Sequence, residues 1–115
     1  MAVSVLTSMP SEIIEDFKSL IDAKIIDTWV YDDDGDFTLL SPRWNRIAWF
    51  HPIILNDRII FGIIGRKGFN ISIEEYGVYH GQLVESLVTH YIRKVNSISI
   101  LKPEEYNVDT DKIDF

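Results

Sequence analysis

The chain contains 115 residues and no cysteine, with 46% hydrophobic, 12% aromatic and 25% charged residues. This composition is that of an ordinary globular domain, so it excludes a disordered chain, a collagen-like repeat and a fibrous coiled coil. The formal net charge of −7 argues against nonspecific binding to nucleic acid or to anionic membranes, because both require a cationic surface.

The length predicts a single domain, residues 1–115, because a chain of this size buries roughly two-thirds of its surface in one core. The lack of cysteine excludes disulfides and thiol catalysis, and it favours the reducing cytoplasm. No stretch reaches the roughly 18 apolar residues that span a bilayer, and residues 1–6 lack the features of a signal peptide. We therefore expect a cytoplasmic protein that does not bind membranes.

Residues 8–22 are predicted to form the first helix. Five apolar residues recur at the spacing of one helical face: Ile13, Ile14, Phe17, Leu20 and Ile21. Ser8 or Ser11 can cap the start, and Pro10 suits the first turn, where its missing N–H is not needed. The opposite face is nearly all acidic and consists of Glu12, Glu15, Asp16, Ser19 and Asp22. That face must be exposed to water.

A β-hairpin is predicted around an aspartate-rich turn. Residues 24–31 and 37–40 are rich in β-branched and aromatic residues, and Asp32-Asp33-Asp34-Gly35-Asp36 separates them. Asp34-Gly35 supplies the two positive-φ positions of a type I′ turn. We expect residues 29–31 to pair with residues 38–40.

The middle of the chain predicts three further strands. Residues 43–51 form the first, which ends at Pro52 because proline removes a ladder donor. Asn56-Asp57 then makes a tight turn between residues 53–55 and residues 58–64. The last of these strands is apolar on both alternating faces, so it should lie in the centre of the sheet with both faces covered.

A long second helix is predicted after residue 72. Ser72 and Glu75 have the spacing of a capping box. Gly77 and Gly81 weaken the first turns, so the regular helix should begin only near Tyr79. The residues expected to face the core around 83–95 are Val84, Leu87, Val88 and Tyr91.

The order of these elements predicts an α+β fold. Its sheet is largely antiparallel, with about five to six strands, an N-terminal helix and a long helix before the last strand, around Ile98 and Ile100. Residues 103–115 are expected to form a frayed acidic tail. If both helices cover one face, the apolar far side of residues 59–64 needs a strong bend or a partner subunit, and the latter predicts a homodimer.

Three carboxylates of the hairpin turn, those of Asp32, Asp34 and Asp36, are of the type that calcium prefers. The spacing does not fit a calcium loop, since counting from Gly35 places Val30 at the first ligand position and Ser41 at the last. We interpret the cluster as a solvated turn, with an acidic partner-binding loop as the alternative. No metal and no other cofactor is expected.

No motif in the chain is typical of an enzyme. His80 lies within the apolar stripe of the second helix, so it is interpreted as a core or interface histidine, and no companion for acid–base catalysis is found. His51, before Pro52, is interpreted as a strand-end residue. Residues 62–68 lack the Walker spacing, and no serine lies in a nucleophile elbow.

Charge is distributed unevenly along the chain. Residues 1–40 carry a net charge of −7, whereas residues 41–67 carry +4. The basic segment combines cations with indoles, namely Arg43, Arg46, Arg58, Arg66 and Lys67 with Trp44 and Trp49. We interpret it as a basic hairpin end, and the alternative for this segment is binding of single-stranded nucleic acid, which the total charge opposes. For the protein as a whole, a small-molecule or single-strand nucleic-acid binding module is a further alternative.

An acidic single domain without a catalytic set is typical of a protein that blocks a larger one by binding it. In these general features the chain resembles the bacterial immunity proteins of contact-dependent growth inhibition systems, which bind and block a delivered toxin domain. The resemblance implies a non-enzymatic protein whose partner is a cationic toxin domain, of nuclease type, because acids favour binding to a basic groove. A phage-type inhibitor or adaptor that mimics nucleic-acid charge is the alternative. The predicted acidic surface consists of Glu12, Glu15, Asp16, Asp22, Asp32, Asp33, Asp34 and Asp36.

Overall fold

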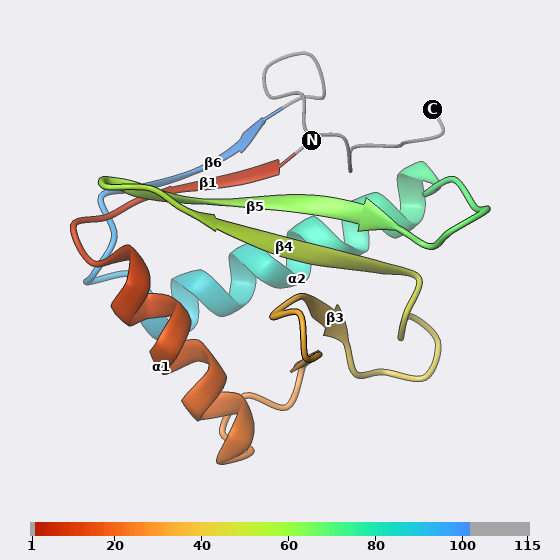
Figure 1. Ribbon diagram of the computed structural model, residues 1–115, viewed down its shortest axis with the longest axis horizontal. Coiled ribbons are helices and arrows are strands. Elements are labelled where there is room, and N and C mark those ends of the chain that lie inside the picture. Colours follow the sequence, from red (N-terminus) through yellow and green to blue (C-terminus); the bar gives the residue numbers. More distant parts are fainter. Residues whose placement is uncertain (1, 102–115) are drawn as a thin grey trace.

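The computed structural model describes residues 2–101, and it shows one six-stranded antiparallel sheet with two helices (Figure 1). The elements are β1 (Ala2–Leu6), α1 (Pro10–Asp22), β2 (Trp29–Tyr31), β3 (Phe37–Leu39), β4 (Ala48–Ile54), β5 (Arg58–Gly65), α2 (Ile73–Tyr91) and β6 (Ser97–Leu101). The strand order is β2-β3-β4-β5-β1-β6. The α+β prediction is therefore confirmed, and the tail predicted at 103–115 lies outside the described residues.

The predicted element order omits β1, which is an interior strand of the sheet. It lies between β5 and β6, and its Val5 is opposite Ile59 on one side and Ile98 on the other. Its sequence, AVSVL, alternates over only five residues. Such a segment is too short for periodicity alone to identify it as a strand. Val3 and Val5 are fully buried, so this short strand belongs to the core.

The two strands predicted at 43–51 and 53–55 are one strand, β4, which continues through Pro52. Leu55 N–H donates to the Arg58 carbonyl, so odd-numbered positions of β4 bond to β5 and Pro52 faces the side of β3. On that side the only β3–β4 pair is Phe37 with Phe50, so proline interrupts no ladder there. The prediction is also wrong for residues 43–47, which form a turn before β4.

The predicted hairpin is confirmed, and its register places residues 29–31 opposite 37–39, one residue earlier than expected. The predicted type I′ turn is wrong, because Gly35 alone in this loop has a positive φ, of +81°. The Asp32 carboxylate accepts hydrogen bonds from the N–H groups of Asp34 and Asp36, each 3.0 Å long. These bonds stabilise a wider loop, in which Gly35 N–H donates to the Asp32 carbonyl.

Both helices pack on the same face of the sheet (Figure 1). The Phe17 ring of α1 lies 5.1 Å from Phe37 of β3 and 6.1 Å from Tyr91 of α2, measured between ring centroids. The predicted serine caps of α1 are wrong, because Met9 occupies the N-cap and makes no side-chain bond there. Pro10 is the first helical residue, as expected.

Helix α2 begins at Ile73, so the prediction of a start near Tyr79 is wrong. The capping box is present in full: Glu75 N–H donates to Ser72 Oγ at 3.1 Å, and Ser72 N–H donates to Glu75 Oε1 at 2.8 Å. These bonds and the burial of Tyr76 hold the first turns in spite of the glycines. Leu87 is buried as predicted, whereas Val88 is 43% exposed.

Strand β5 is an interior strand, as predicted, and its residues are buried on both faces. Ile59, Phe61 and Ile63 belong to the core beneath the helices. On the opposite face Ile60 is only 3% exposed, and Ile64 is half-buried. The homodimer stays a prediction.

Candidate functional site

The structure divides the predicted acidic surface into two groups. One group makes hydrogen bonds or close polar contacts within the chain, and it consists of Asp16, Asp22, Asp32 and Asp36. The other group is exposed, and its carboxylates have no hydrogen-bond or ion-pair partner among residues 2–101. We call it the four open acids: Glu12, Glu15, Asp33 and Asp34.

Asp16 contributes to the packing of α1 against α2. The Tyr91 hydroxyl donates to Asp16 Oδ2 at 2.8 Å, between residues 75 positions apart in the chain. Burial, followed by this hydrogen bond, raises the pKa of the Tyr91 phenol above its usual range. Asp16 therefore has a structural role that its place on the outer helical wheel did not indicate.

Asp22 fastens the end of α1 to β2. The Tyr31 hydroxyl donates to Asp22 Oδ1 at 2.7 Å, and this bond raises the pKa of the Tyr31 phenol. The Lys18 ammonium lies 5.5 Å from the centroid of the Tyr31 ring. The same ammonium would lie 3.6 Å from a Cβ at Gly35. We call residues 32–36 the aspartate loop. The acidic face of α1 and the aspartate loop are therefore adjacent, with Lys18 between them.

The aspartate loop is built on two of its own carboxylates. Asp32 accepts from two backbone N–H groups, and Asp36 Oδ1 lies 2.6 Å from Nδ1 of His51. Ligand atoms of Asp32, Asp34 and Asp36 lie within 4.8 Å of one another. The bonds of Asp32 explain this convergence as loop geometry, and we assign no metal to it.

The structure also divides the basic segment. Arg43 pairs with Glu74 at 3.3 Å and lies over the Trp44 ring, while Arg58 pairs with its neighbour Asp57 at 3.0 Å. The remaining cations line one cavity of about 540 Å³, together with an amide and an indole. We call this cavity the Trp49 cleft, and its lining residues are Asn45, Arg46, Trp49, Arg66 and Lys67.

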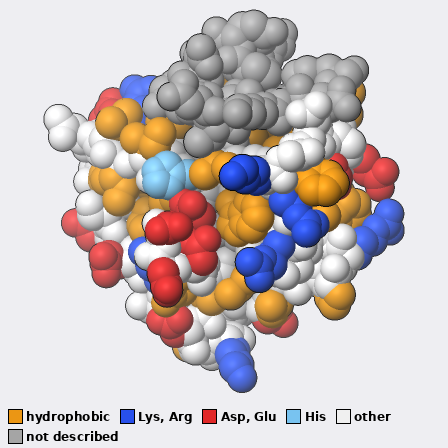
Figure 2. Space-filling view, turned by 45° about the vertical axis from the view of Figure 1, so that its right-hand side comes forward, with side chains coloured by type: hydrophobic (Ala, Val, Ile, Leu, Met, Phe, Trp, Pro, Cys, Tyr) orange, Lys and Arg blue, Asp and Glu red, His pale blue; other side chains and the backbone are white. Residues whose placement is uncertain are grey.

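A second, shallower cavity of about 320 Å³ adjoins the Trp49 cleft. It shares Asn45, Arg46 and Trp49 with the cleft and extends to Tyr31 and Asp32. Figure 2 shows one face of the molecule on which acidic side chains gather beside a histidine, and Lys and Arg side chains gather next to them with hydrophobic side chains between. The cavity that Arg46 and Asp32 share is therefore lined by charges of both signs.

His80 is a core histidine, as predicted. Its side chain is 3% exposed, its Nδ1 lies 2.8 Å from the Tyr76 carbonyl, and its ring stacks on the Tyr76 ring at 4.0 Å. Burial lowers the pKa of His80 to about 3, so the imidazole is neutral at pH 7. Its Nε2 and the Tyr76 hydroxyl are buried without a partner among the described residues.

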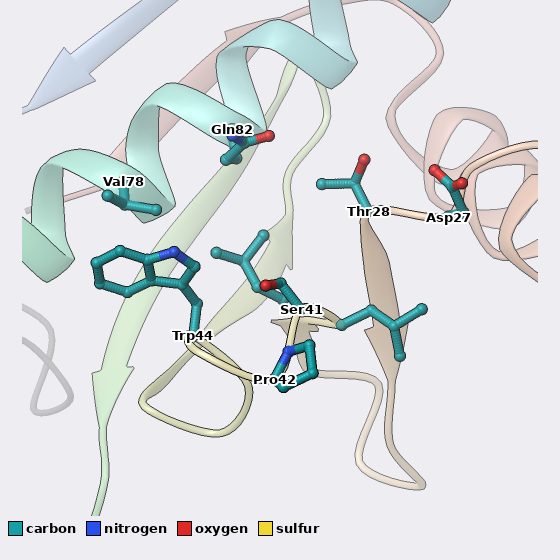
Figure 3. A pocket seen from close by; sticks show the side chains of 9 residues that line it. Asp27, Thr28, Ser41, Pro42, Trp44, Val78 and Gln82 are labelled. Atoms are coloured by element: carbon teal, nitrogen blue, oxygen red, sulfur yellow. The ribbon is translucent and has the colours of Figure 1, made fainter.

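Another cavity of about 540 Å³ lies between the turn after β3 and helix α2 (Figure 3). Figure 3 shows the Trp44 indole beside Val78 on one side, and Thr28 and Asp27 on the other. Asp27 is the one ionisable residue of its lining, and the hydroxyls of Thr28 and Ser41 and the amide of Gln82 line the cavity too. Sequence reasoning missed this cavity because it placed Trp44 within a strand.

No protein-family model, curated protein or solved structure matches this chain. The resemblance to immunity proteins therefore remains a prediction. Within residues 2–101, neither helix combines the length and the apolar character that crossing a bilayer requires.

Proposed function

We propose that the protein binds a basic partner protein through the acidic surface of α1 and the aspartate loop, without catalysis. The observation that carries this proposal is the set of four open acids. Exposed carboxylates without an ion-pair partner among residues 2–101 repel one another, and a cationic partner relieves that repulsion. The partner class that fits the resemblance is a cationic toxin domain, which the protein neutralises by covering it.

The open acids act mainly on the rate of association. A group of like charges creates a field that steers an oppositely charged partner into contact, whereas each exposed charge contributes little to the final affinity. This steering decreases as salt is added, because the Debye length shortens to about 8 Å at physiological ionic strength. The C-terminal end of α1 adjoins the loop at residues 32–36, where Tyr31 bonds to Asp22 and Lys18 lies beside Gly35. In the proposed complex a single partner covers the open acids of both elements.

The proposal expects the toxin domain to be encoded directly upstream of this gene, and the test uses that domain in a catalytically inactive form. We expect the double variant Asp33→Asn and Asp34→Asn to associate more slowly with that domain, by about threefold to tenfold at low salt. The same double variant should protect cells less well against the active toxin. Stopped-flow association at several salt concentrations measures the first effect, and a growth competition measures the second.

The matched control is the double variant Glu74→Gln and Glu85→Gln, which removes the same charge from the exposed side of α2. It should associate at the rate of the original protein. Equal slowing by the two double variants would show that net charge matters and the acidic surface does not. An upstream protein that fails to bind at all would overturn the toxin-neutralising role.

A further inference from the structure

Three of the five residues that line the Trp49 cleft are cations. Arg46 comes from the turn before β4, and Arg66 and Lys67 come from the loop after β5. None of the three has an ion-pair partner among residues 2–101, whereas Arg43 and Arg58 each pair with a carboxylate. Cations gathered around a cavity attract an anion, because their mutual repulsion is then relieved.

The turn that carries Arg46 is held in place by buried groups. Arg46 has a φ of +60°, a left-handed conformation that costs energy for any residue except glycine. Its N–H donates to Thr38 Oγ1 at 3.0 Å, and the Tyr79 hydroxyl donates to the Trp44 carbonyl nearby. Asn45 Nδ2 also donates to the Leu39 carbonyl, at 2.7 Å. These bonds position Arg46 before any ligand arrives.

The other side of the cleft presents planar groups beside the charges. The Arg66 guanidinium lies 5.2 Å from the centroid of the Phe69 ring, and Trp49 is half-buried on β4 with part of its indole accessible. Guanidinium groups bind phosphate oxygens through paired N–H donors, and an indole offers a flat surface to a heterocycle. Cations suited to a phosphate and an indole suited to a planar ring thus line one cavity.

The charge of the neighbouring cavity limits the length of the ligand. Asp32 lines that cavity, and the Asp36 carboxylate lies nearby beside His51, so a polyanion extending in this direction meets negative charge. The Trp49 cleft itself, at about 540 Å³, falls within the range of small-molecule sites. A compact anion satisfies both conditions.

We propose that the Trp49 cleft binds a compact phosphorylated ligand with a planar ring, of the nucleoside monophosphate class. The phosphate contacts Arg46, Arg66 and Lys67, and the base stacks on the Trp49 indole. This site is separate from the four open acids. Binding of this ligand can therefore be tested separately from binding of the proposed partner protein.

The test is calorimetric titration of the full chain with adenosine 5′-monophosphate at low salt. We expect saturable binding of one molecule, weakened when salt is raised. Adenosine, which lacks the phosphate, and ribose 5-phosphate, which lacks the planar base, should each bind at least tenfold more weakly. Absence of binding by adenosine 5′-monophosphate, or equal binding by ribose 5-phosphate, overturns the proposal.

Two variants of the cleft and one control variant locate the site. The double variant Arg66→Gln and Lys67→Gln should weaken binding at least tenfold, and Trp49→Leu should weaken it by a similar factor. The double variant Arg43→Gln and Arg58→Gln removes the same charge elsewhere and should leave binding within twofold. An equal loss of affinity in both double variants would show that net charge alone causes the effect, which contradicts a defined site.

A 5′-phosphorylated deoxythymidine octamer distinguishes a compact ligand from a strand. We expect the octamer to bind no more tightly than the mononucleotide, because its further phosphates meet the aspartate loop. Tighter binding by the octamer than by the mononucleotide, lost on Trp49→Leu, would overturn the compact ligand in favour of strand binding. Thermal unfolding of each variant, with a midpoint close to that of the original protein, ensures that lost binding is not lost folding.

Discussion

At the scale of single residues, the core of this protein contains a histidine that must stay neutral. His80 packs edge-on against Phe50 at 5.0 Å and flat against Tyr76, and its Nε2 faces no partner among the described residues. A charged imidazole in this position loses its hydration without compensation. Folding therefore selects the neutral form and makes stability depend on pH.

We predict that the free energy of unfolding decreases as the pH falls below 6.5, the ordinary pKa of histidine. The pKa of His80 is lowered to about 3 in the folded protein, so the unfolded state binds a proton that the folded state rejects. Stability is full above pH 6.5 and declines by about 1.4 kcal/mol per pH unit towards pH 3, or about 2 kcal/mol between pH 7 and pH 5. Urea unfolding at several pH values measures the decline.

The variant His80→Phe isolates this contribution, because phenylalanine keeps the flat ring and removes the titrating group. Its unfolding free energy should change between pH 7 and pH 5 by about 2 kcal/mol less than that of the original protein. Parallel pH profiles of the two proteins would show that His80 titrates normally and is accessible to water. The two proteins share every other residue, so the difference between their pH profiles belongs to position 80.

At the scale of elements, sequence patterns identified those parts whose signals are local. The capping box of α2 and the hairpin around Gly35 were predictable, because each depends on residues a few positions apart. Strand β1 was not, because five residues carry little periodicity and its two neighbours, β5 and β6, lie far along the chain. Pro52 misled the strand assignment, since its tolerance depends on the short pairing between β3 and β4.

Two glycines of α2 give a prediction at this scale. Gly77 and Gly81 are exposed, and a Cβ built at either position would meet nothing within 4 Å. Each substitution to alanine should therefore raise the unfolding free energy, by about 0.5 to 1 kcal/mol, because alanine restricts the unfolded chain and favours the helix. Urea titration measures the gain, and a loss of stability in either variant would mean that the helix needs a glycine there.

The core face of α2 gives a second prediction, with a neighbour as its control. Leu87 is fully buried, so Leu87→Ala should reduce the unfolding free energy by about 2 to 5 kcal/mol through lost burial and a cavity. Val88 is 43% exposed, and Val88→Ala should cost less than about 1 kcal/mol. Similar losses in both variants, measured in urea, would contradict the observed orientation of the helix.

At the scale of the whole molecule, the structure arranges the charges differently from what the sequence indicated. The pattern placed eight acids on one surface, and the structure uses half of them for internal bonds. Helical periodicity could not reveal this, because the partners of Asp16 and Asp22, Tyr91 and Tyr31, come from other elements. Likewise, of the basic segment only the residues of the Trp49 cleft converge, because folding brings the turn before β4 beside the end of β5.

The position of β1 has a consequence for the growing chain during synthesis. Its Leu6 pairs with Arg58 and Ser97, so β1 is made before both of its partner strands and waits for β5 and then for β6. At about 5 to 20 residues per second, the first of these delays lasts several seconds. Throughout that time the backbone donors and acceptors of β1 lack their native partners, and the nascent chain is vulnerable to pairing with other strands. The charged residues that follow, in α1 and the aspartate loop, keep neighbouring nascent chains apart by repulsion.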